Sequence, residues 1–294
     1  MKRTNVSRIK TGSAAVGKAK ARQAIKRAVA GVTELNERRV REREETKAAA
    51  LAEVRIVQSA IEKLIEQDEA AKIAIGKLRR QGSDLNLRLD RTFEEALRPA
   101  QQSLLALTLH QHVHVIGLPY DFGWNWGNPN LQVSDPAYGW AGVFAYSNRT
   151  SAAAAGIGVI LTTDKPAIVS VRPFIRYTWQ YQMIVSGIGS NADVRGGIDW
   201  SAWVDGTLLS PGIRRHQAFS DSISWVSKRN ELGDGDAPMD QVSLDFTMAP
   251  GKVYSVNFGS WVECEHENWI GSAASGAKVE ATIPFIAVLR FVAG

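Results

Sequence analysis

The sequence predicts an α plus all-β protein, in which a long N-terminal helical coiled-coil segment precedes an antiparallel, jelly-roll-like β-sandwich. Two observations indicate this fold class: the spacing of apolar residues changes near residue 100, and all nine Trp follow that point. The charge changes there as well. Residues 1–100 carry 23 Lys and Arg against 14 Asp and Glu, whereas the rest of the chain carries 12 against 16. We therefore expect a domain boundary near residue 100.

Residues 1–32 are expected to form a basic tail, flexible or partly helical. They contain nine Lys or Arg and no acid. Such a tail can neutralise phosphates of a nucleic acid, or it can dock on an acidic protein surface in a larger assembly. A transit peptide has a similar composition. The candidate anchoring or polyanion-binding residues are Lys18, Lys20, Arg22, Lys26 and Arg27.

Residues 33–98 are expected to form a coiled-coil or bundle segment. Helix formers dominate, and apolar residues recur at alternating steps of four and three. Eleven of the fourteen positions in this stripe are apolar: Ala50, Val54, Val57, Ile61, Leu64, Asp68, Ala71, Ile75, Leu78, Gly82, Leu85, Leu89, Thr92 and Ala96. Apolar residues beside the stripe favour a bundle over a thin two-stranded coil. One copy cannot bury this stripe, so we expect a homo-oligomer through residues 33–98.

The predicted interruption of this helix is Gln81-Gly82-Ser83-Asp84. Glycine ends a helix well, and Ser83 or Asp84 can cap the next one. Either one kinked helix passes through this tetrapeptide, or helix 33–80 folds back onto helix 84–98. Polar Asp68 lies in the apolar stripe, where it would set register or mark a water-filled point.

Residues 99–294 are expected to form a Trp-rich antiparallel β-sandwich domain. Apolar and polar residues alternate over residues 175–183, 242–248 and 279–291, as they do in half-buried strands. Turn signals separate these runs, among them Gly233-Asp234-Gly235-Asp236. In the run 279–291 we place Val279, Ala281, Ile283, Phe285, Ala287, Leu289 and Phe291 on one face.

The segment from Tyr120 to Asn130 is expected to be largely loop and to carry a ligand-binding surface. Exposed Trp beside amides can stack on sugars or anchor a protein contact. The alternative is that the rings pack back against one end of the sandwich. Trp203 has the opposite strand parity to Trp200 and should face outward if Trp200 faces inward. The ligand-binding candidates are Trp124, Asn125, Trp126, Asn128, Trp140 and Trp203.

His110, His112 and His114 form the candidate metal site. Alternate residues of a strand share a face, so three imidazoles could converge on a transition metal. However, three ligands from one strand lie in a row, and a polar strand face explains the pattern equally well. Asp234, Asp236 and Asp240 could offer oxygen ligands to Ca²⁺, but a solvated turn is the favoured interpretation because the full calcium-loop pattern is missing.

Several function classes find no support in the sequence. The single cysteine, Cys264, excludes an intrachain disulfide. We find no apolar run long enough to span a bilayer, no Gly-x-Ser-x-Gly elbow and no phosphate-binding glycine loop. Lys and Arg interrupt every candidate signal-peptide core, so we expect cytoplasmic synthesis, with a released particle or assembly as one destination, and not secretion by the signal-peptide route. No enzyme activity and no cofactor are expected.

The leading hypothesis is a non-enzymatic oligomer whose β-sandwich presents a recognition surface for a carbohydrate or protein receptor. The layout is similar in outline to fibre and spike proteins of phage-like particles. One alternative is a nucleic-acid-binding protein that acts through its basic N-terminal region. A second alternative is a metal-dependent enzyme that uses residues His110 to His114.

Overall fold

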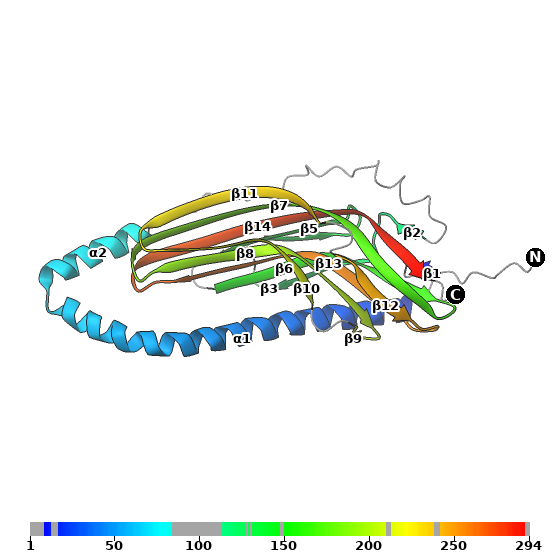
Figure 1. Ribbon diagram of the computed structural model, residues 1–294, viewed down its shortest axis with the longest axis horizontal. Helices are drawn as coiled ribbons and strands as arrows, with labels where there is room; N and C mark the ends of the chain where they lie inside the picture. The colour runs from blue at the N-terminus through cyan, green and yellow to red at the C-terminus, as the bar shows by residue number, and fades with distance from the viewer. Residues whose placement is uncertain are drawn as a thin grey trace, which may run out of the picture.

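The computed structural model describes residues 9–12, 17–83, 113–127, 129, 131–147, 150–209, 213–237 and 242–291. Figure 1 shows helix α1 (Lys18–Glu66) running along one side of two stacked sheets and past their end. There helix α2 (Glu69–Ser83) turns back and contacts β14 and β7 at the end of the sheets. The coarse prediction of a long N-terminal helix with an antiparallel β-sandwich is confirmed.

The described strands form two sheets of seven strands each, and all the pairings between strands are antiparallel. Sheet A contains β1 (Ile9–Thr11), β3 (Phe122–Gly127), β6 (Thr150–Thr163), β8 (Asn191–Val204), β9 (Thr207–Leu208), β10 (Arg214–Ser224) and β13 (Tyr254–Glu267). Sheet B contains β2 (Val113–Ile116), β4 (Leu131–Asp135), β5 (Trp140–Ser147), β7 (Ala167–Ile188), β11 (Ser227–Ala237), β12 (Leu244–Met248) and β14 (Ile270–Phe291).

Eight of these strands pair in a nested order. Along the chain they are β5, β6, β7, β8, β10, β11, β13 and β14. The first pairs with the last, the second with the seventh, the third with the sixth and the fourth with the fifth. This order is that of one long antiparallel hairpin rolled up so that its strands are distributed over two sheets.

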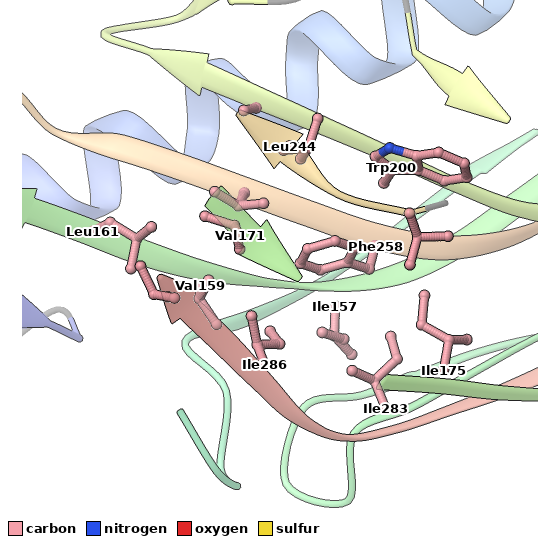
Figure 2. Packing of buried hydrophobic residues seen from close by; sticks show 14 of the residues in the cluster. Ile157, Val159, Leu161, Val171, Ile175, Trp200, Leu244, Phe258, Ile283 and Ile286 are labelled. Carbon is pink, nitrogen blue, oxygen red and sulfur yellow. The ribbon is translucent and has the colours of Figure 1, made fainter. Parts of the chain in front are cut away.

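The hydrophobic core lies between the facing sides of the two sheets. Figure 2 shows Ile157 and Phe258 of sheet A close to Ile175 and Ile283 of sheet B, and all four are fully buried. Because every second side chain of a strand points to the same side, the alternating runs at 175–183 and 242–248 fill this space. Burying one such side chain contributes roughly 1.5–3 kcal/mol.

The alternation predicted for residues 279–291 is confirmed through Ile283 and is wrong beyond it. The pairing of β14 with β7 shifts register between Thr282 and Phe285. Ile283, Ile286 and Val288 all belong to the core cluster. Pro284 explains the shift, because proline has no N–H for the ladder and is accommodated in sheets at bulges. The bulge changes the face on which all later residues lie.

The predicted turn at Gly233–Asp236 is also wrong, because these residues continue β11. Gly233 pairs with Trp179 and Gly235 pairs with Tyr177. A Cβ at Gly233 would lie 2.6 Å from the Trp179 ring, so the aromatic ring covers the glycine across the ladder. Asp234 and Asp236 therefore stand on a strand, and Asp240 lies outside the described residues.

Helix α1 departs from the predicted boundaries at both ends. It begins at Lys18 and passes residue 32 without a break. Strand β1 pairs with β6, so part of the predicted tail belongs to sheet A. The interruption that falls at Gln67–Asp68 was not predicted from the sequence, and α2 ends at Ser83, inside the predicted break at 81–84. Asp68 Oδ1 accepts hydrogen bonds from the N–H groups of Ala70 (2.9 Å) and Ala71 (3.1 Å), so Asp68 caps α2. Residues 84–98 lie outside the described residues.

The first half of α1 packs on the outer face of sheet A. The buried residues recur at helical spacing and are small. We call these four the alanine face: Ala21, Ala24, Ala28 and Val32. Ala24, Ala28 and Val32 form a hydrophobic cluster with Trp124, Trp203 and Trp261. A Cβ at Gly31 would lie 2.2 Å from Cζ3 of Trp203, so only glycine permits this approach of helix to ring.

Candidate functional site

The predicted Trp surface is divided between buried and accessible residues. Trp124 and Trp203 are each only 4% exposed, because α1 covers them. Trp203 faces away from the core, as its parity predicts, but it is not a surface residue. The segment expected to be loop is strand β3, in which Phe122 and Trp124 lie opposite Gly158 and Gly156. Those glycines leave room for the two rings, since a Cβ on either would overlap them.

Trp126 and Asn125 are the predicted ligand-binding residues that line a groove. Trp126 is half-buried and Asn125 is exposed. Both line a groove of about 570 Å³ between β3 and α1, and its helical wall includes Glu37 and Glu44. Gln132 Nε2 donates a hydrogen bond to the backbone oxygen of Trp126 over 2.7 Å. The groove thus offers a partly exposed indole beside amide and carboxylate groups.

The structure does not gather the remaining ligand-binding candidates at this groove. Trp140 is half-buried on β5, which belongs to sheet B, whereas the groove is built on sheet A. Asn128 lies outside the described residues. Of the six predicted residues, only Asn125 and Trp126 are both described by the structure and located at this groove.

The five basic candidates lie on the exposed side of α1. Lys18, Lys20, Arg22, Lys26 and Arg27 are all exposed. Arg27 Nη1 donates a hydrogen bond to the backbone oxygen of Asp205 over 3.1 Å. The alanine face on the other side of the helix is the one that docks. We call the five residues the basic face of α1.

The proposed histidine row is described only at its last member. His114 is exposed on β2, and its Nε2 lies 3.4 Å from Thr11 Oγ1. His110 and His112 lie outside the described residues. In the described part of the chain, no group of three His, Cys, Asp or Glu side chains could hold a metal ion. The metal site stays a prediction.

The far end of α1, together with α2, exposes large apolar side chains. We call residues 48–83 the apolar arm. The exposed fractions are 47% for Val54, 75% for Ile56, 58% for Val57, 66% for Leu64 and 63% for Ile73. Val54, Val57 and Leu64 belong to the predicted stripe, which the sandwich therefore leaves partly uncovered. Exposed apolar surface of this kind marks interaction sites.

A polar layer that the sequence analysis missed joins the middle of α1 to sheet A. Arg43 and Lys47 extend the docking side of the helix beyond the alanine face and meet carboxylates on β13. Arg43 Nη1 lies 2.5 Å from Glu263 and its Nε lies 2.7 Å from Glu265. Lys47 Nζ lies 2.9 Å from Glu267. The sequence did contain a signal for this layer. Acids alternate at 263, 265 and 267, and the bases that face them recur at helical spacing.

Asp199, which is buried, and Arg39, which is half-buried, make no ion pair with the other residues that the structure describes. Asp199 is 1% exposed, and burial raises the pKa of its carboxyl to about 6, although Arg215 and Arg39 oppose the rise. Burial also lowers the pKa of Arg39, and the nearby Arg215 lowers it further. Arg39 Nη2 donates to the backbone oxygen of Ile213 over 2.7 Å. The layer thus holds charge that is only partly compensated.

Comparisons with known proteins give no family for this chain. No protein-family model matches it, and no curated protein does. A chain from the structure of infectious bursal disease virus, Gt strain, is 12% identical over 70% of this chain and 45% of its own, with a TM-score of 0.17. Dimeric latent PorU from Porphyromonas gingivalis is 12% identical over 59% of this chain and 12% of its own, with a TM-score of 0.19.

A chain of cowpea mosaic virus top component is 10% identical over 44% of this chain and 88% of its own, with a TM-score of 0.16. This chain covers 45% of the infectious bursal disease virus chain, which is less than half of its length. TM-scores this low carry no argument, so function is argued from the residues of this chain. Neither described helix is apolar enough over a sufficient length to cross a bilayer.

Proposed function

We propose that this protein is a non-enzymatic assembly component, fibre- or spike-like in layout, that self-associates through the apolar arm and displays a jelly-roll sandwich. The observation that carries the proposal is the exposure of Val54, Ile56, Val57, Leu64 and Ile73 on the arm. Apolar side chains of this size gain roughly 1.5–3 kcal/mol each when they are removed from water. A second copy of the arm supplies a matching surface.

The position of the arm favours assembly between copies. The last turns of α1 extend past the end of the sheets (Figure 1), away from the part of α1 that docks on sheet A, and α2 returns to β14 and β7. Val54, Val57 and Leu64 follow the alternating three-and-four spacing of a coiled-coil seam. A bundle of arms would bury this seam while each sandwich stays folded on its own core.

The nested strand pairing supports the jelly-roll part of the proposal, because jelly rolls are rolled-up double sheets of eight strands. In this fold both sheets shield a common core, so outward residues are free to vary in chemistry. The groove at Asn125 and Trp126 is the surface that we propose for a carbohydrate or protein receptor. A half-buried indole beside amides suits either ligand.

Light scattering on the full-length chain tests the assembly. We expect an oligomer for the wild type. The double variant Val57→Glu and Leu64→Glu should shift it to the monomer, because carboxylates on the seam would be buried unpaired. Ser59→Glu is the matched control: Ser59 is exposed on the opposite side of the same helix, so this variant should stay oligomeric. A monomeric wild type would refute the proposal.

A second candidate function rests on the basic face. Its five cations are exposed on the first three turns of α1 and could contact nucleic-acid phosphates. DNA binding across a salt series tests this function. Replacing all five by Gln should lower the affinity and flatten its dependence on salt. If the affinity is unchanged by the substitutions, the basic face does not bind DNA, and docking on an acidic protein surface is the remaining proposal for it.

A further inference from the structure

A hollow lies between the first turns of α1 and two turns of the sandwich. Its volume is about 330 Å³. One turn, Asp205-Gly206, joins β8 to β9, and Figure 1 shows β9 beside this part of α1. The other turn, Pro250-Gly251-Lys252, precedes β13. The N–H of Asp205 donates a hydrogen bond to the backbone oxygen of Val253 over 3.3 Å, which ties the two turns together.

The charged side chains that line this hollow are mostly cations. Lys20 and Arg27 come from α1, and Lys252 comes from the sandwich. Asp205 is the one acid among the described residues of the lining. All four residues are exposed. Because three cations meet one carboxylate, two positive charges stay uncompensated in the hollow.

Helical geometry explains why only two residues of the basic face line the hollow. Lys20 and Arg27 are seven positions apart, which is close to two full turns, so they lie on nearly the same side of α1. Lys18, Arg22 and Lys26 recur at steps of four on a different side, and none of them lines the hollow. The basic face therefore consists of two stripes, and the stripe of Lys20 and Arg27 is the one beside the sandwich.

Asp205 holds two of the cations in place without neutralising both. Its backbone oxygen accepts the 3.1 Å hydrogen bond from Arg27 Nη1, and its Oδ2 lies 2.7 Å from Lys252 Nζ. The stem of Arg27 packs on Gly206, where a Cβ would lie 2.8 Å from the Cβ of Arg27. Arginine has five N–H donors and lysine has three. Each of these two cations therefore keeps donors for a ligand.

The ligand that suits this hollow is an anion with several acceptor oxygens. A phosphate group accepts hydrogen bonds from the planar guanidinium of arginine and is attracted by the point charge of lysine. The hollow is open to solvent on a convex part of the molecule, so a long chain of phosphates can lie across it. Exposed cations of this kind neutralise the phosphates of a nucleic-acid backbone and release its counterions.

We propose that the hollow seats a backbone phosphate of a nucleic acid, held by Lys20 and Arg27 of α1 together with Lys252 of the sandwich. This inference rests on the second candidate function, binding of nucleic acid through the basic face. It adds that the sandwich supplies one of the contacts. The binding surface is therefore complete only where α1 is docked beside the two turns.

DNA binding by the full-length protein tests the contact from the sandwich, with the affinity for a short duplex measured over a series of salt concentrations. Lys252→Gln removes one phosphate contact. It should lower the affinity and make the slope of log affinity against log salt shallower by about 0.9. Lys252→Arg keeps the charge and should keep the wild-type slope.

Lys228→Gln is the matched control. Lys228 is an exposed lysine on β11 of sheet B and does not line the hollow, so this variant loses the same charge elsewhere. Its affinity and slope should equal those of the wild type. Lys20→Gln repeats the test from the helix side, because Lys20 is exposed and makes no ion pair with the other described residues. This variant should make the slope shallower by the same amount as Lys252→Gln.

The outcomes separate this inference from the function on which it rests. If the five Gln substitutions on the basic face lower the affinity while Lys252→Gln keeps the wild-type slope, the function stands and the contact from the sandwich is wrong. Equal changes in Lys252→Gln and Lys228→Gln would show a general charge effect and would also overturn the contact. A wild-type protein that binds no DNA would remove both the function and the contact.

Discussion

At the scale of single residues, Gly31 and Trp203 set how closely α1 approaches sheet A. The Trp203 ring is held in place by a 2.9 Å hydrogen bond from its Nε1 to Ser201 Oγ. The ring occupies the space where a Cβ of residue 31 would lie. The same glycine weakens the helix in isolation, because glycine costs about 1 kcal/mol relative to alanine in a helix interior. Packing and local propensity therefore oppose each other here.

Substituting Gly31 and Gly76 by alanine, one at a time, separates the two effects. Gly31→Ala should destabilise the protein by about 1–3 kcal/mol, because the methyl group overpacks the contact with Trp203. Gly76→Ala should stabilise it by about 0.5–1 kcal/mol, since a Cβ at Gly76 meets nothing within 4 Å. Urea unfolding measures both changes. A stabilised Gly31→Ala protein would contradict the close approach of helix to ring.

At the scale of elements, α1 docks through two chemically different surfaces. The alanine face provides the apolar contact near its beginning, and the polar layer continues the contact along β13. Ion pairs that are partly buried contribute little net stability, but breaking one leaves an uncompensated charge. The apolar contact therefore supplies most of the docking energy, while the polar layer fixes the register of helix against sheet.

Asp199 gives the polar layer a predicted pH dependence. Its carboxyl has a folded-state pKa of about 6, above the ordinary value of 3.8. The folded state thus binds this proton more tightly than the unfolded state does. The stabilisation is fully present below about pH 4 and is lost as the pH rises through 6. The shift corresponds to about 3 kcal/mol.

Asp199→Asn should remove this pH-dependent component, because an amide does not titrate. Urea unfolding gives the free energy of unfolding of the wild type and the variant at pH 4 and pH 7. The change between the two pH values in the wild type, minus the same change in the variant, measures the contribution of Asp199. An identical pH dependence in both proteins would show that Asp199 titrates normally.

At the scale of the whole molecule, the helical third and the β-sandwich do not form separate units. Strand β1 pairs with β6, and α1 covers three Trp on the outer face of sheet A. Composition and charge change near residue 100. Nevertheless, β1 and α1, which precede that point, complete the packing of the sandwich that follows it. Division of the chain at that point would expose buried aromatic surface.

A fragment of residues 99–294 should therefore behave differently from the full chain. Its Trp124, Trp203 and Trp261 lose the cover of α1, so the fluorescence maximum of Trp should move to longer wavelength. Binding of a hydrophobic dye should increase for the same reason. Fluorescence of the fragment and the full chain at equal concentration measures both changes. An unshifted emission maximum would mean that the sandwich buries these rings without the helix.

The sequence alone determined the order of helix and sandwich, the strands at 175–183 and 242–248, and the apolar stripe. These features depend on periodicity, which reflects local geometry. Only the tertiary structure decided that Trp124 and Trp203 are buried, that Gly233 and Gly235 continue a strand, and that Arg43 and Lys47 meet the carboxylates of β13. The physical reason is that the periodic position of a residue in its strand or helix shows which side it faces. Whether that side is buried depends on which distant segment of the chain packs against it.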